Sequence, residues 1–148
     1  MSHDTYTIML YYYPNKPILI TIDSKLIAEK SVDPNSIAEI KKNGTRLCLW
    51  HSKEEALKHK NYKNFIFWNR HKSVLKYEPC PELLDELCSL NLPNTCHLDA
   101  ELLHFKTTHI KHQIYFYDLY WFDGKQCFNE FEARRDILAN ILAKQNFK

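Results

Sequence analysis

The stretch IYFYDLYWF, residues 114–122, decides the fold that the sequence predicts. Its side chains are apolar on both alternating sides, and successive side chains of a strand point to opposite faces. This pattern predicts a central strand that is covered on both faces. Asp123 and Gly124 then form a turn, and Asn129 with Glu132 caps a long amphipathic helix. The apolar residues of that helix are Phe131, Ile137, Leu138, Ile141 and Leu142.

Upstream of this strand, strands and short helices alternate along the chain. Leu47 to Trp50 and Phe65 to Asn69 are predicted strands, rich in apolar and aromatic residues. Between them, Ser52 and Glu55 have the spacing of a capping box, which opens a helix that runs to about Lys60. A third helix begins at Pro81, carries leucines on one face and ends before Pro93.

Three further elements rest on weaker patterns. Tyr6 to Tyr13 and Ile18 to Ile22 are apolar runs around a proline-containing turn, which predicts a β-hairpin. A short helix is expected from Asp33 to the stop at Asn43 and Gly44. Thr95 to Phe105 is predicted to be a helix, because Leu98, Leu102 and Phe105 recur at helical spacing.

Length and composition bound the architecture. The 148 residues are 45% hydrophobic and 26% charged, as expected of one domain spanning residues 1–148. We expect an α+β fold, with a mixed or antiparallel sheet of about four to six strands and about three to five helices packed mainly on one face. The chain has only two glycines, which argues against a P-loop or a dinucleotide-binding fingerprint.

The cysteines and the apolar segments bear on the cellular location. The five cysteines are odd in number and contain no CxxC pair, so we expect reduced thiols instead of a disulfide framework. The sequence shows neither a signal peptide nor an apolar segment of about 20 residues that could span a membrane. The predicted location is the cytoplasm, although export without a leader is not excluded. The oligomeric state is not predicted.

Charge is segregated along the chain although the net charge is only +2. Residues 56–77 contain six basic residues and no acid, whereas residues 78–101 contain six acids and no lysine or arginine. The basic block also carries aromatic residues, a mixture that suits an anionic partner. The alternative is that the aromatics are core residues and that the acidic segment neutralises the lysines. The predicted partner-binding residues are Lys60, Tyr62, Lys63, Trp68, Arg70 and Lys72.

These features favour a non-enzymatic binding protein of the adaptor, inhibitor or effector type. A protein partner is favoured over nucleic acid, because a pI near 8.2 is below the values typical of nucleic-acid-binding domains. A single-stranded nucleic-acid-binding protein is the first alternative. A small hydrolase or metal-dependent enzyme with an Asp/His cluster is the second. No catalytic residue, metal site or cofactor is predicted.

Several residues could nevertheless carry chemistry. On the predicted helix, His97, Glu101 and His104 share one face and could hold a metal ion. Asp118 interrupts an apolar strand, so a buried carboxylate there needs a partner. A hydrogen bond from a tyrosine hydroxyl, a lysine or a histidine that fixes the strand register is favoured, and a general base in a cleft is the alternative. Other candidates follow predicted strands, where reactive groups of α/β enzymes commonly lie. They are Asp23, His51 and Asp123.

Overall fold

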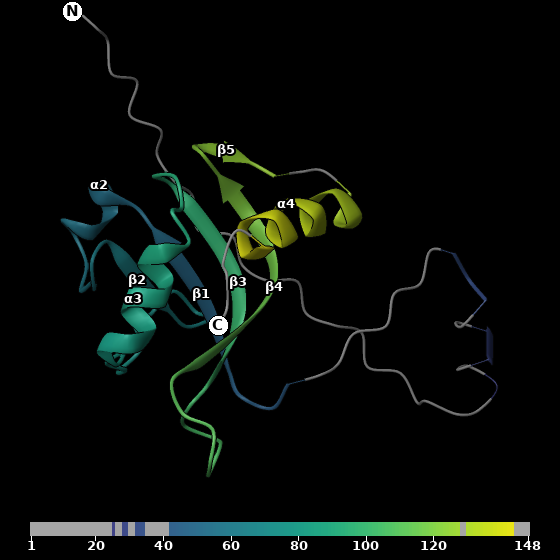
Figure 1. Ribbon diagram of the computed structural model, residues 1–148, viewed down its shortest axis with the longest axis horizontal. Helices are drawn as coiled ribbons and strands as arrows, with labels where there is room; N and C mark the ends of the chain where they lie inside the picture. Colours follow the sequence, from purple (N-terminus) through teal and green to yellow (C-terminus); the bar gives the residue numbers. More distant parts are fainter. Residues whose placement is uncertain (1–24, 26–27, 30–31, 35–41, 128–129, 144–148) are drawn as a thin grey trace, which may run out of the picture.

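The computed structural model describes residues 25, 28–29, 32–34, 42–127 and 130–143. The predicted hairpin of residues 6–22 lies outside these residues, as does most of the helix expected after Asp33. Within them, five strands form one antiparallel sheet in the order β2-β1-β3-β4-β5 (Figure 1). The strands are β1 (Thr45–His51), β2 (Phe65–Trp68), β3 (Cys96–Leu103), β4 (Gln113–Phe122) and β5 (Lys125–Gln126).

In the described part of the chain three helices accompany the sheet, so the predicted α+β fold with an antiparallel sheet is confirmed. They are α2 (Lys53–Ala56), α3 (Pro81–Ser89) and α4 (Phe131–Ala143). The predicted capping box is present, because the Ser52 hydroxyl accepts a hydrogen bond from the Glu55 backbone N–H at 3.2 Å. The helix that it opens ends at Ala56, four residues earlier than Lys60. Pro81 occupies the start of α3, as predicted.

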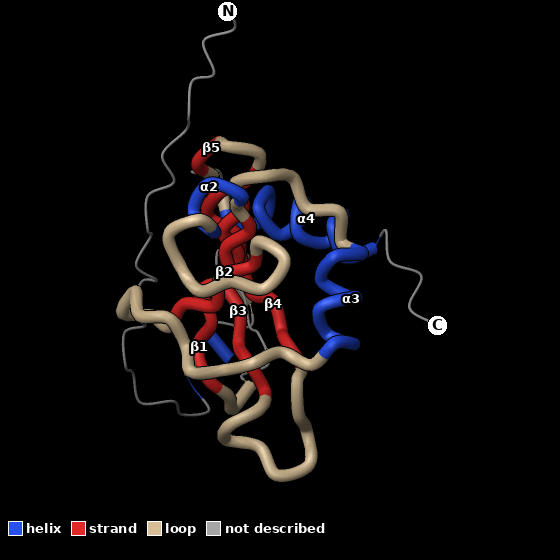
Figure 2. The backbone as a smooth tube through the Cα atoms, turned by 90° about the vertical axis from the view of Figure 1, so that its left-hand side faces the viewer, coloured by secondary structure: helices blue, strands red, loops and turns tan. Residues whose placement is uncertain are grey.

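Helices α3 and α4 lie on the same side of the sheet, which Figure 2 shows nearly edge-on. We call this side the first face. Its core consists of apolar strand residues beneath Leu83 and Leu87 of α3 and Leu138 and Ile141 of α4. The strand residues are Leu47, Leu49, Phe65, Phe67, Leu98, Ala100, Leu102 and Leu119. The opposite side, the second face, holds a separate cluster of Cys48, Trp50, Ile66, Trp68 and Trp121.

The segment predicted as a helix from Thr95 to Phe105 is strand β3 instead. Leu98 and Leu102 are four residues apart, a spacing that keeps two side chains on one side of a strand as well as of a helix. Ala100 lies between them on the same face, and all three pack in the core of the first face. Residues from 96 to 100 are buried, which the pairing of β3 with both β1 and β4 explains.

Strand β4 contains the predicted stretch 114–122, but it is central over only part of its length. It pairs with β3 along its length, whereas β5 covers its outer side only at Trp121 and Phe122. Residues 114–117 are half-buried. Strand β3 is flanked by β1 and β4 along almost its whole length, whereas β2 covers β1 only from Cys48 to His51. Apolar alternation therefore identified the strand correctly but placed it too deep in the sheet.

Candidate functional site

The predicted partner-binding residues lie on both sides of β2 in the sequence and within the strand itself. Lys60 and Lys63 precede the strand, whereas Arg70 and Lys72 follow it. Four strand residues at about 3.3 Å each therefore separate the two pairs. The four basic side chains are exposed. Trp68 is only 3% exposed and packs edge-to-face on Trp50, so its indole does not form part of the surface.

Three of these residues, Lys60, Tyr62 and Lys63, contact other parts of the molecule. The Lys63 ammonium lies 3.3 Å from the Asp85 carboxylate of α3, so the acidic segment neutralises part of the basic block. The Tyr62 hydroxyl donates to the Tyr77 carbonyl at 3.3 Å, and the Lys60 ammonium lies over the Tyr62 ring. The burial of Trp68 has a simple reason, because alternation in β2 directs it and Ile66 into the core of the second face.

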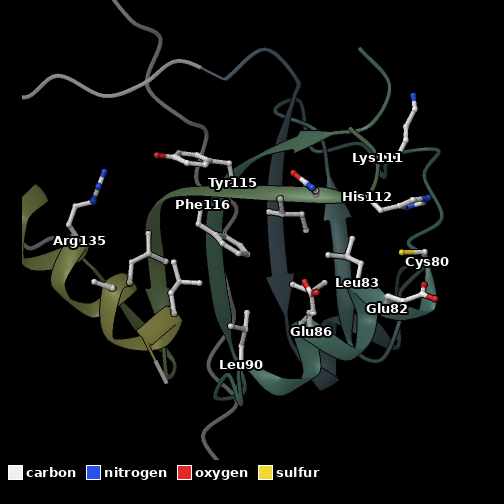
Figure 3. Close-up of a pocket in the computed structure, with 16 residues that line it drawn as sticks. Cys80, Glu82, Leu83, Glu86, Leu90, Lys111, His112, Tyr115, Phe116 and Arg135 are labelled. Atoms are coloured by element: carbon white, nitrogen blue, oxygen red, sulfur yellow. The ribbon is translucent and has the colours of Figure 1, made fainter. Parts of the chain in front are cut away.

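A groove of about 800 Å³ lies on the first face between α3 and α4 (Figure 3). The two helices do not pack along each other, which leaves the sheet exposed between them. Leu83 and Leu87 contribute to the α3 wall, Leu138 contributes to the α4 wall, and Phe116 of β4 contributes to the floor. Both the volume and the predominance of apolar side chains are typical of a ligand-binding site. No pattern in the sequence predicts this groove.

Charged side chains border the groove unevenly. Glu82 and Glu86 lie on the α3 wall, and Figure 3 shows the Glu86 carboxylate directed from α3 toward β4. Neither carboxylate has an ion-pair partner among the described residues. Lys111 lies beside His112 at one end of the groove, and Arg135 belongs to the α4 wall. The α3 wall is therefore acidic, whereas the opposite borders are basic.

An aromatic cluster fixes the end of the groove where the chain passes from β3 to β4. The Tyr77 hydroxyl lies 2.8 Å from His112 Nδ1, and the His112 backbone N–H donates to His104 Nδ1 at 3.3 Å. The two imidazole rings are 4.3 Å apart. Burial raises the pKa of Tyr77, so its hydroxyl stays protonated near neutral pH. These contacts hold Lys111 and His112 against the groove.

The second face contains a polar network in addition to its apolar cluster. The Arg46 guanidinium makes two hydrogen bonds to the Asp99 carboxylate, and the Tyr120 hydroxyl donates to the same carboxylate at 3.2 Å. Burial raises the pKa of Asp99 despite the opposing effect of Arg46. His97 lies beside the Trp50 and Tyr120 rings. Burial lowers the pKa of His97 to about 3, so its imidazole is neutral.

Asp118 meets a cation, although not one of the partners expected from the sequence. Arg134 of α4 donates to both carboxylate oxygens, at 2.8 and 3.1 Å. Asp118 lies opposite Asp99 in the sheet, next to a register shift in the pairing of β3 with β4. Two carboxylates in this position would repel each other. Each is instead neutralised by its own arginine, so we assign Asp118 a structural role.

The remaining candidates do not assemble a reactive centre among the described residues. No group of three or more His, Cys, Asp or Glu residues there could hold a metal ion, and His97, Glu101 and His104 lie on a strand and its end. His51 and Asp123 both lie next to Cys96. Burial raises the pKa of the Cys96 thiol to about 12, which leaves it protonated and unreactive. Asp23 lies outside the described residues.

No protein-family model, curated protein or solved structure matches this chain. In the part of the chain that the structure describes, no helix is long and apolar enough to cross a membrane. The function must therefore be inferred from the groove and its neighbouring residues.

Proposed function

We propose that this chain is a non-enzymatic, protein-binding domain that takes an apolar segment of its partner into the groove between α3 and α4. The observation that carries the proposal is the groove itself, about 800 Å³ in volume and floored by the sheet. Buried apolar contacts at the centre of an interface supply most of its binding energy, and a groove between helices provides such a centre.

The exposed basic residues Lys60, Lys63, Arg70 and Lys72 have a secondary part in this proposal. Because they lie at the two ends of β2, they steer an acidic partner surface toward the domain instead of forming the central contact. The cytoplasm is the proposed compartment. The five cysteines support this location, because all of them are free thiols.

The groove can be filled without disturbing the core. Ala139 is exposed on α4 and lines the groove, and its neighbour Asn140 is equally exposed but does not line it. Ala139→Trp would place an indole in the space that the partner segment needs. Asn140→Trp adds the same side chain to the same helix and is the matched control.

Selection of short random peptides displayed on phage tests the proposal without a known partner. We expect peptides with several apolar residues to be enriched on the wild-type domain and on Asn140→Trp. Their affinity should fall by about tenfold or more on Ala139→Trp, which corresponds to the loss of about 1.4 kcal/mol. The absence of enrichment, or equal binding by all three proteins, would refute the proposed site.

A further inference from the structure

The groove opens along the side of β4. It is lined by four consecutive residues of this strand, Gln113 to Phe116. Consecutive side chains point to opposite faces of a sheet, so a groove confined to one face would contact only every second residue. Contact with all four indicates that the groove reaches the outer edge of β4. Figure 3 shows Tyr115 and Phe116 extending to opposite sides of the strand, so the lining includes residues from both sides of β4.

Among the residues that the structure describes, no strand pairs with the outer edge of β4 beside the groove. Among the described residues, β5 pairs with β4 only at Trp121 and Phe122, and the Cys127 N–H donates to the Tyr120 carbonyl at 2.8 Å. The Leu119 N–H is satisfied by the Asp118 carboxylate at 2.8 Å. No described residue therefore forms a backbone hydrogen bond to the outer side of β4 from Gln113 to Tyr117. An edge of five residues has the length of an ordinary strand.

We infer that the partner segment binds in an extended conformation, adds a strand to the edge of β4 from Gln113 to Tyr117, and directs alternate apolar side chains into the groove. This inference rests on the proposed function and specifies how the same site recognises its partner. An extended segment satisfies the unpaired backbone groups of β4 while its side chains fill the apolar space. Main-chain hydrogen bonds then supply affinity, and the pockets for alternate side chains supply specificity.

The charges around the groove define the segment further. Glu86 points from α3 toward β4, and Glu82 lies on the same wall. The segment therefore carries a lysine or arginine among its groove-facing residues, where its ammonium or guanidinium meets these carboxylates. A second copy of this chain fits less well. Its corresponding strand, residues 113–119, has the sequence QIYFYDL, which contains no basic residue.

A synthetic peptide, acetyl-Thr-Ile-Thr-Lys-Thr-Ile-Thr-amide, is the probe. Two derivatives carry N-methyl groups on alternate backbone amides, one on the odd positions and the other on the even positions. In a bound strand, only one of these two sets of amides faces β4. N-methylation leaves every side chain in place but removes the hydrogen-bond donors. NMR titration of the isotope-labelled domain measures the affinity of each peptide.

We expect one N-methylated derivative to bind about tenfold or more weakly than the parent peptide, and the other to bind within about threefold of it. The parent peptide should also slow amide exchange at alternate residues between Gln113 and Tyr117. Equal weakening by both derivatives, as for a helical peptide, would overturn strand addition but leave the proposed groove intact. Failure of the parent peptide to bind would also overturn strand addition. The proposed function is tested separately by the phage selection.

Two controls test the partner's chemistry. A peptide with glutamate in place of lysine should bind the wild-type domain about threefold or more weakly than the parent peptide. The variant Glu86→Lys should instead bind the glutamate peptide more tightly than the parent peptide. An unchanged preference would refute the contact with Glu86. We expect the free domain to sediment as a monomer with exchanging amides in residues 113–117. A dimer in which these amides are already protected would assign the edge to a second copy and overturn the inference.

Discussion

The two faces of the sheet are built from different chemistry. The first face is a continuous layer of leucine and phenylalanine beneath α3 and α4. The second face combines three tryptophans and Cys48 with the buried polar residues His97 and Asp99. Apolar packing can tolerate small shifts between layers, whereas a buried carboxylate requires its partners in defined positions. We therefore expect the first face to supply most of the stability and the second to fix the strand register.

Neighbouring residues of β3 allow this comparison to be tested directly. Leu98 and Asp99 are adjacent in the chain, almost fully buried, and directed to opposite faces. Leu98 lies opposite Leu49 and Leu119, and Asp99 lies opposite Cys48. Substitution of either residue affects the same part of the same strand. A difference in unfolding free energy between the two variants therefore reflects the two faces and not the position in the sheet.

The largest effect is expected for Leu98→Ala. The substitution leaves a cavity among the leucines of the first face, and it should lower the free energy of unfolding by about 3 to 4 kcal/mol. Urea denaturation followed by tryptophan fluorescence measures this loss. A loss below about 1 kcal/mol would show that the first face is loosely packed and would contradict the role we give it.

Asp99→Ala should lower the free energy of unfolding slightly less, by about 3 kcal/mol. The substitution leaves Arg46 without the Asp99 carboxylate, but the Arg46 side chain is 35% exposed and therefore partly solvated. The important difference is that this loss can be rescued. Removal of the stranded cation in Asp99→Ala/Arg46→Ala should recover part of the stability lost in the single variant. Urea denaturation of both single variants and the double variant completes the cycle. Strictly additive losses would show that the pair does not act as a unit.

Local patterns allowed the sequence to predict much of the fold. The alternation in residues 114–122, the capping box at Ser52 and the proline at the start of α3 each act within a few residues, and the structure confirms all three elements. The segment Thr95 to Phe105 was misassigned because its leucines fit both periodicities. Only the strands on either side of β3 resolve that ambiguity, and they lie far away in the sequence.

The groove could not be predicted from the sequence for a related reason. The groove exists because α3 and α4 cover the sheet without packing along each other, a spacing that no local pattern encodes. The basic residues are close in sequence, yet β2 separates Lys63 from Arg70. The apolar neighbours of Asp118 in the sequence indicated that its carboxylate needs a partner. The identity of that cation, Arg134, depends on where α4 packs.

The smallest expected change in stability concerns His97. It tests whether the second face excludes water. Burial lowers the pKa of His97 to about 3, against about 6.5 in an unfolded chain. Between these values the unfolded state binds more protons than the folded state, so stability rises with pH and is lost as the pH falls. At pH 5.5 the His97 contribution should have fallen by about 1.4 kcal/mol relative to pH 7.5.

The variant His97→Leu isolates this contribution because leucine does not titrate. Urea denaturation of wild type and variant at both pH values gives the difference, and the other titrating groups contribute equally to both proteins. We expect the stability of the variant to fall less on acidification, by about 1.4 kcal/mol. An identical pH dependence would mean that His97 binds its proton over the same pH range in the folded protein as in the unfolded chain. Water or a carboxylate would then have to reach it, and the second face would not be the closed layer that its buried tryptophans indicate.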